Sequence, residues 1–115
     1  MLNTKVTMTV RQPVAGTSII DIQGDITGAS EEALMAAYEE ASKDGAKSII
    51  LNFSDLDYMN SSGIGLLVTM LIRTQRQKQS LRACGLSDHY VEIFKLTRLD
   101  EAIGIYATES EALSA

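Results

Sequence analysis

The decisive stretch of this chain reads Asp57-Tyr58-Met59-Asn60-Ser61-Ser62-Gly63-Ile64-Gly65-Leu66-Leu67-Val68. A nearly all-apolar run, residues 49–53, comes just before it, and an amphipathic segment follows. This order predicts a buried strand, then a polar loop, then a helix that begins at Ser61 and Ser62. A helix N-terminus has free N–H groups and favours negative charge. A serine there is therefore suited both to capping the helix and to carrying a phosphate.

The segments before this stretch predict strands of two kinds. Residues 5–12 and 17–23 alternate apolar and polar side chains, and Pro13 and Gly16 separate them. Two such period-two segments around a break predict an antiparallel hairpin. Residues 49–53 are instead continuously apolar, which predicts a strand in the middle of a sheet with helices on both sides.

Two longer helices and several short elements complete the pattern. Ser30, followed by Glu31 and Glu32, marks the start of the first helix, and Gly45 marks its end. The second helix carries apolar residues at positions i, i+3, i+4, i+7 and i+8, which are Ile64, Leu67, Val68, Leu71 and Ile72.

The C-terminal third of the chain predicts shorter elements. Residues 81–84 and 103–107 are expected to be strands, and a short helix containing Tyr90 and Phe94 connects them. Residues 109–113 are expected to form a terminal helical turn that frays.

The order of these elements, β-β-α-β-α-β-α-β-α, predicts an α/β fold in a single domain over residues 1–115. We expect a mixed four- to five-stranded sheet, antiparallel at the first hairpin and parallel elsewhere, flanked by about four helices. A chain of 115 residues is long enough for a sizeable core. The side chains expected to be buried are Ile49, Leu51, Leu67, Val68, Leu71 and Phe94.

Composition excludes several classes of function. The formal net charge of −5 argues against a nucleic-acid-binding protein, which usually has a basic stripe. Cys84 is the single cysteine, so the chain has no disulfide framework and no multi-cysteine metal site, and a reduced core thiol is expected. No run of 18 apolar residues occurs, and residues 1–6 lack a signal-peptide pattern. We therefore expect a cytoplasmic protein with no membrane contact.

The residue patterns of an enzyme active site are missing. His89 is the single histidine, and Ser61 has Met59 and Gly63 where a nucleophile elbow requires glycines. The Gly63-Ile64-Gly65 segment is too short for a dinucleotide fingerprint and lacks the lysine of a P-loop. We assign no catalytic residue, metal ligand or cofactor. A small enzyme that uses Ser61 with His89 as its base stays open as a minor alternative.

At this point the chain resembles the STAS family, small domains named after sulfate transporters and anti-sigma factor antagonists. The resemblance covers essentially the whole chain. Its motifs are the strand at residues 49–53, the segment Asp55-Leu56-Asp57-Tyr58-Met59, the helix start Ser61-Ser62-Gly63-Ile64-Gly65, and the earlier Ile20-Asp21-Ile22-Gln23-Gly24-Asp25-Ile26.

The resemblance implies a function in partner switching. Similar members are free-standing bacterial anti-sigma factor antagonists, which bind an anti-sigma factor that is also a serine kinase and so release the sigma factor. The kinase phosphorylates a serine at the start of the second helix, which ends binding, and a metal-dependent serine phosphatase restores it. By motif match that serine is Ser61. We expect Ser62 to face the sheet or to cap the helix locally, because it lies about 100° further around the axis.

Two positions depart from the family pattern. Phosphorylated members usually have an aspartate before the serine, where this chain has Asn60, and another aspartate where it has Thr27. Both a working phosphorylation switch and a STAS module that binds without phosphorylation, in a signalling assembly or beside a transporter, therefore remain open.

The loops at residues 25–30 and 57–65 are expected to form one partner-binding surface, because both follow strands that end at the carboxyl edge of the sheet. Gly63 and Gly65 serve either close approach of a partner or tight packing of the helix on the sheet. A weak homodimer is also left open. The expected partner-binding residues are Asp25, Thr27, Gly28, Asp57, Asn60, Ser61, Ser62, Gly63 and Gly65.

Overall fold

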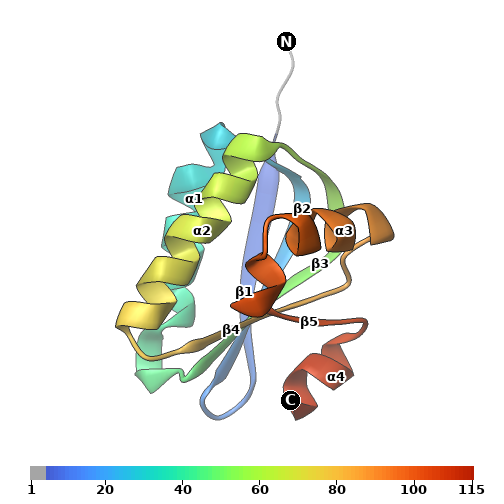
Figure 1. Ribbon diagram of the computed structural model, residues 1–115. Helices are drawn as coiled ribbons and strands as arrows, with labels where there is room; N and C mark the ends of the chain where they lie inside the picture. The colour runs from blue at the N-terminus through green and yellow to red at the C-terminus, as the bar shows by residue number, and fades with distance from the viewer. Residues whose placement is uncertain (1–4) are drawn as a thin grey trace.

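A computed structural model describes residues 5–115 as a five-stranded sheet with helices on both faces (Figure 1). The strands lie in sequence order across the sheet. They are β1 (Val6–Val14), β2 (Thr17–Ile26), β3 (Ser48–Met59), β4 (Ser80–Cys84) and β5 (Gly104–Tyr106). Strand β1 pairs antiparallel with β2, and the other neighbours pair in parallel. The predicted mixed sheet is confirmed.

Four α-helices and three short 3₁₀ turns connect the strands. The helices are α1 (Glu31–Ala41), α2 (Ser61–Arg76), α3 (Asp88–Leu96) and α4 (Glu109–Ser114). The 3₁₀ turns are η1 (Gly28–Ser30), η2 (Lys43–Gly45) and η3 (Leu99–Glu101). Figure 1 shows α1 and α2 side by side in one layer against the sheet.

Two apolar clusters hold the layers together. The larger one joins α1, α2 and α3 to one face of the sheet, where Ile49, Leu51 and Phe94 are fully or almost fully buried. The smaller one lies on the other face, where Ala112 of α4 packs with Ile50 and its neighbours. Burial of β3 on both faces confirms the prediction made from its continuous apolar run.

Strand β3 is longer than the sequence pattern indicated. Residues 55–59, expected to be a polar loop, continue the strand, and the pairing with β2 runs as far as Ile26 and Met59. The register skips Asp57, which is the extra residue of a β-bulge. Backbone pairing with the whole of β2 explains the extension, because the ladder satisfies N–H and C=O groups whatever the side chains are.

The buried stripe of α2 is also rotated from the predicted one. Leu67 and Leu71 are buried as expected, but Val68 is 38% exposed and Ile72 is 44% exposed. The buried face of α2 is formed by Gly63, Leu67, Met70, Leu71 and Thr74. The burial predicted for Val68 is therefore wrong.

The C-terminal turn, expected to fray, is packed as α4. Ala112 is fully buried, and Arg82 donates a hydrogen bond of 3.1 Å to its carbonyl oxygen. Arg11 bridges from β1 to both Asp21 on β2 and Glu109 on α4, with Nη2–oxygen distances of 2.8 Å and 2.7 Å. These contacts fix a helix that is too short to be stable by itself.

Candidate functional site

The exits of β2 and β3 lie side by side at the carboxyl edge of the sheet. Ile26 and Met59 form their last pair, and the N–H of Asn60 donates to the carbonyl oxygen of Ile26 at 3.2 Å. Turn η1 follows one strand and α2 follows the other, so the two segments at residues 25–30 and 57–65 meet here. Ligands of α/β sheets commonly bind at this edge.

Asn60 caps helix α2. Its side-chain Oδ1 accepts a hydrogen bond of 2.8 Å from the N–H of Gly63, and its carbonyl oxygen accepts one of 3.0 Å from Ile64. Asparagine is among the best residues for this position. Because Asn60 supplies the cap, the hydroxyl of Ser61 is not needed for it.

Ser61 and Ser62 are the first two residues of α2, and both side chains are exposed. Within residues 5–115, neither hydroxyl makes a hydrogen bond, and the N–H groups of these two residues donate to no acceptor. Ser62 neither faces the sheet nor caps the helix, so that expectation is wrong. Its side chain lies beside Gly28, where an added Cβ would be 3.4 Å from the Cβ of Ser62.

The two glycines that follow have different roles. A Cβ added at Gly63 would overlap the carbonyl oxygen of Ile26 and lie 2.9 Å from both its carbonyl carbon and its Cγ2. Gly63 is therefore required for packing of α2 against β2. Gly65 has nothing within 4 Å of an added Cβ, and it is exposed. Of the two, Gly65 is the one that leaves room for another molecule.

Turn η1 is held by its own side chains. The hydroxyl of Thr27 accepts from the N–H of Ala29 at 3.2 Å, and the hydroxyl of Ser30 accepts from the N–H of Thr27 at 3.0 Å. This reciprocal capping box shapes the loop beside Ser62. Threonine at position 27 thus has a local structural role in this chain.

Two carboxylates and one aromatic ring lie near the ends of β2 and β3, shortly before η1 and α2 begin. Asp57 is exposed, and Asp25, which is partly buried, pairs with Tyr58 in the β2–β3 register. Tyr58 is 51% exposed. Tyr58 lies inside the range 57–65 predicted to form the surface, but its side chain was not among the residues expected to bind the partner. An exposed aromatic residue beside a binding motif was the available signal.

Tyr90 is a second residue whose role the sequence did not reveal. Its hydroxyl accepts a hydrogen bond of 2.8 Å from the N–H of Met59. Strand β4 pairs with β3 only as far as Asn52, so Tyr90 of α3 satisfies a backbone group for which no strand is available. It thereby fixes the end of β3 directly before Asn60 and Ser61.

The groups whose pKa values are shifted lie on the face of the sheet that α4 covers, opposite α1 and α2. Hydrogen bonds from Arg11 hold the pKa of the Asp21 carboxyl below its ordinary value, and burial raises the pKa of the Cys84 thiol. Cys84 is buried and free, as predicted. In the part of the chain that the structure describes, no three His, Cys, Asp or Glu side chains are grouped to hold a metal ion. None of the helices within residues 5–115 is long and apolar enough to cross a membrane.

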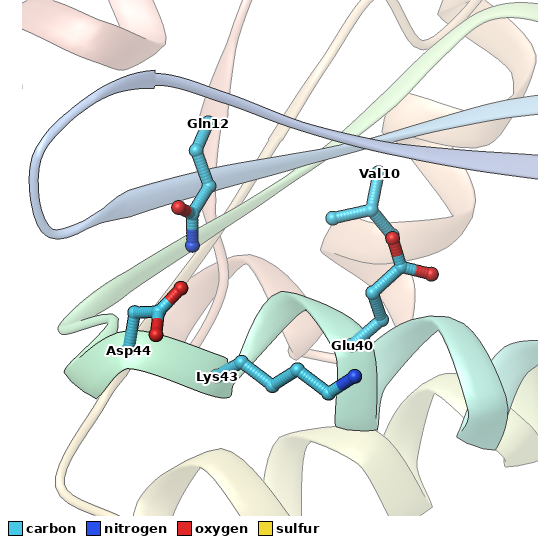
Figure 2. Close-up of a pocket in the computed structure, with 5 residues that line it drawn as sticks. All are labelled: Val10, Gln12, Glu40, Lys43 and Asp44. Carbon is cyan, nitrogen blue, oxygen red and sulfur yellow. The ribbon is translucent and has the colours of Figure 1, made fainter.

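A surface hollow of about 280 Å³ lies away from the serines (Figure 2). It is found between β1 and the C-terminal end of α1, whereas η1 and Ser62 lie near the other end of that helix. The residues that line it are Val10, Gln12, Glu40, Lys43 and Asp44. The hollow is therefore separate from the predicted partner-binding surface.

The arrangement around Ser61 is suited to modification and to protein contact. An exposed hydroxyl stands at a helix N-terminus with two free N–H groups nearby, where a phosphate is favoured by hydrogen bonding and by the helix dipole. Small side chains leave the surface approachable at Gly28, Ser61, Ser62 and Gly65.

Comparisons with known proteins agree with this architecture. The family model of the STAS domain matches residues 5–112. An anti-sigma-B factor antagonist of Staphylococcus aureus is 30% identical over 63 residues, which are 55% of this chain and 58% of that protein. The match thus spans less than two thirds of that relative's own length.

Solved structures resemble the chain over nearly all of its length. The crystal structure of an anti-sigma factor antagonist from Mycobacterium paratuberculosis superimposes with a TM-score of 0.82 at 19% identity, covering 98% of this chain and 95% of that one. The Bacillus cell fate determinant SpoIIAA in its phosphorylated form gives a TM-score of 0.64 at 25% identity, covering 94% and 97%.

Proposed function

The chain belongs to the STAS domain family, and we propose that it is an anti-sigma factor antagonist. In this proposal the carboxyl edge of the sheet, with Ser61 at its centre, binds an anti-sigma factor and so releases a sigma factor. The observation that carries the proposal is the hydroxyl of Ser61 at the first position of α2. It is exposed and makes no hydrogen bond within residues 5–115. The names of the relatives support the choice of partner.

The partner-binding surface extends down α2 from the serine. Ser61, Gly65, Val68 and Ile72 follow one another at spacings of four, three and four residues, which places them on one side of the helix. Gly65 offers no side chain, and Val68 and Ile72 leave an apolar strip exposed. A partner that covers this strip removes apolar area from water, which favours binding.

The anti-sigma factor is proposed to act also as the serine kinase that modifies Ser61. A phosphate adds about −1.5 to −2 charges, and Asp25 and Asp57 already lie at this edge. The phosphate finds free N–H donors at the helix start, so the fold tolerates it. A docked partner instead meets added charge and a costly desolvation, which breaks the complex. A metal-dependent serine phosphatase reverses the modification, and the cytoplasm is the compartment for all three proteins.

The kinase reaction tests this proposal. The anti-sigma factor of the same genome is incubated with the protein and ATP, and the modified residue is mapped by mass spectrometry. We expect phosphate on Ser61, none on the Ser61→Ala variant and normal incorporation by the Ser62→Ala variant. Phosphate on Ser62, or on neither serine while the complex still forms, refutes the switch and leaves the alternative of a STAS module that binds without phosphorylation.

The binding surface is tested separately from phosphorylation. Ile72→Glu places a charge on the exposed strip of α2, and Leu96→Glu does the same at a side chain of α3 that is 76% exposed. We expect Ile72→Glu to weaken anti-sigma factor binding at least tenfold and Leu96→Glu to leave it unchanged. Equal affinities for the two variants contradict the proposed position of the surface.

A further inference from the structure

Strand β1 presents an open row of backbone groups at the edge of the sheet. Within residues 5–115, β2 is its one strand neighbour. The N–H of Asp25 donates to the carbonyl oxygen of Lys5 at 3.3 Å, which fixes the phase of the antiparallel ladder. In such a ladder, alternate residues direct their N–H and C=O groups toward the neighbour. Those of Val6, Met8 and Val10 therefore point away from the sheet.

This edge lacks the usual protection against pairing. Natural edges carry charges, prolines or bulges that block the addition of another strand. Residues 6–10 contain none of these, because the irregularity of β1 lies between Arg11 and Val14 and includes Pro13. The open part of β1 is thus five residues of high β-propensity with no charge.

The sequence of that segment, Val6-Thr7-Met8-Thr9-Val10, reads the same in both directions. We propose that it pairs antiparallel with the same segment of a second copy of this chain, about a two-fold axis at Met8. This inference is independent of the function proposed above.

The axis at Met8 agrees with the phase of the ladder. It sets Met8 opposite Met8 of the second copy, and Val6 opposite Val10, so that the outward-pointing residues meet each other. Three such pairs exchange about six backbone hydrogen bonds. Thr7 lies opposite Thr9 of the second copy on the other face, and threonine pairs are favourable across antiparallel strands.

The charged residues at the ends of the segment do not oppose this register. The same register sets Lys5 opposite Arg11 of the second copy. Arg11 is bound by Asp21 and Glu109, so the three side chains together carry a net charge of −1. Lys5, which is exposed, therefore lies opposite an arginine whose charge is already compensated at each end of the interface.

Helix α1 leaves space for this approach. Glu40 lines the hollow beside Val10 and Gln12, which marks the side of α1 that lies nearest the edge strand (Figure 2). Ala36 and Ala33 precede Glu40 by four and seven residues and so lie on the same side of the helix. Their small side chains allow the α1 helices of two copies to lie side by side on one face of the joined sheet.

Sedimentation velocity over a rising protein concentration tests the proposal with two double variants. Thr7→Lys with Thr9→Lys sets lysine opposite lysine in the proposed register, whereas Thr7→Glu with Thr9→Lys sets glutamate opposite lysine. Both sites are exposed, and the two variants differ only in the residue at position 7. We expect a concentration-dependent dimer for the unmodified chain, at least tenfold weaker association for the first variant, and equal or stronger association for the second.

Three results overturn the proposal. They are a chain that stays monomeric at every concentration up to the millimolar range, a dimer that both double variants form equally well, and a dimer that both variants lose equally. Circular dichroism and thermal unfolding of each variant provide the folding control.

Discussion

Replacing Gly63 or Gly65 by alanine should change stability in opposite directions, although both lie in the first turns of α2. An added Cβ at Gly63 lies 2.9 Å from the carbonyl carbon and the Cγ2 of Ile26. Carbon atoms pack at about 3.5–4.0 Å, so α2 must move from β2 by roughly 0.6–1 Å. The obstacle is mostly backbone, which cannot rotate away. The same movement lengthens the hydrogen bond from Asn60 to the Ile26 carbonyl, which is 3.2 Å long.

The magnitudes follow from two opposing terms. Forced overpacking costs about 1–3 kcal/mol, and alanine is favoured over glycine in a helix by up to about 1 kcal/mol. Gly65→Ala gains only the higher helix propensity of alanine, because nothing lies within 4 Å of its added Cβ. Gly63→Ala has the same gain in helix propensity but also carries the cost of overpacking. The difference between the two variants is therefore the packing term of about 1–3 kcal/mol.

Urea unfolding followed by circular dichroism measures both variants against the unmodified chain. We expect Gly65→Ala to raise the free energy of unfolding by about 0.5–1 kcal/mol and Gly63→Ala to lower it. Equal effects at the two positions would refute the reasoning that α2 contacts β2 through Gly63.

Three further predictions concern stability. Leu67→Ala removes a fully buried side chain and should cost about 2–5 kcal/mol of unfolding free energy, whereas Val68→Ala should cost under about 1 kcal/mol; urea titration of both separates the observed stripe of α2 from the predicted one. Tyr90→Phe leaves the buried N–H of Met59 without its acceptor and should cost about 1–3 kcal/mol in the same titration, with faster hydrogen exchange at that amide. Arg11 lowers the pKa of Asp21, so this carboxylate stabilises the fold above its unfolded-state pKa of about 3.9 and ceases to do so as the pH falls through its lower folded-state pKa. Asp21→Asn should therefore be less stable at neutral pH and lose less stability on acidification; parallel urea midpoints for the two proteins below pH of about 4 would contradict this.

The order of elements and the mixed sheet were predictable from the sequence because strong local patterns mark them. A continuous apolar run identified β3, and alternation around Pro13 and Gly16 identified the hairpin. The length of β3 was not predictable in the same way, since pairing with β2 and the hydroxyl of Tyr90 hold its polar end. Both contacts join residues far apart in the chain.

Helix periodicity located α2 but not its orientation. The apolar residues of α2 fit two neighbouring stripes, and Gly63 decides between them. Because it has no side chain, the helix lies close to β2 at that point, which turns Leu67 and Met70 inward and leaves Val68 exposed. The stability of α4 was underestimated for a related reason. Its contact with Arg11 joins Glu109 to a residue 98 positions away, which a local sequence pattern does not reveal.

The sequence correctly placed the serines at the start of α2, but it did not predict which residues surround them. The cap by Asn60 frees both hydroxyls, so Ser62 is exposed as well as Ser61. Asparagine before a helix is a known capping signal, and it identifies position 60 as part of the helix start. The position of η1 beside Ser62 depends on the β2–β3 pairing, which a local pattern does not encode.

The most direct test of the account is the affinity of the anti-sigma factor for the protein with and without phosphate on Ser61. Isothermal titration calorimetry compares the unmodified protein, the protein phosphorylated on Ser61, and Ser62→Asp as a nearby charge control. The account predicts at least tenfold weaker binding for the phosphorylated protein, a smaller loss for Ser62→Asp, and unchanged circular dichroism spectra. Equal affinities for the phosphorylated and unmodified proteins would contradict it.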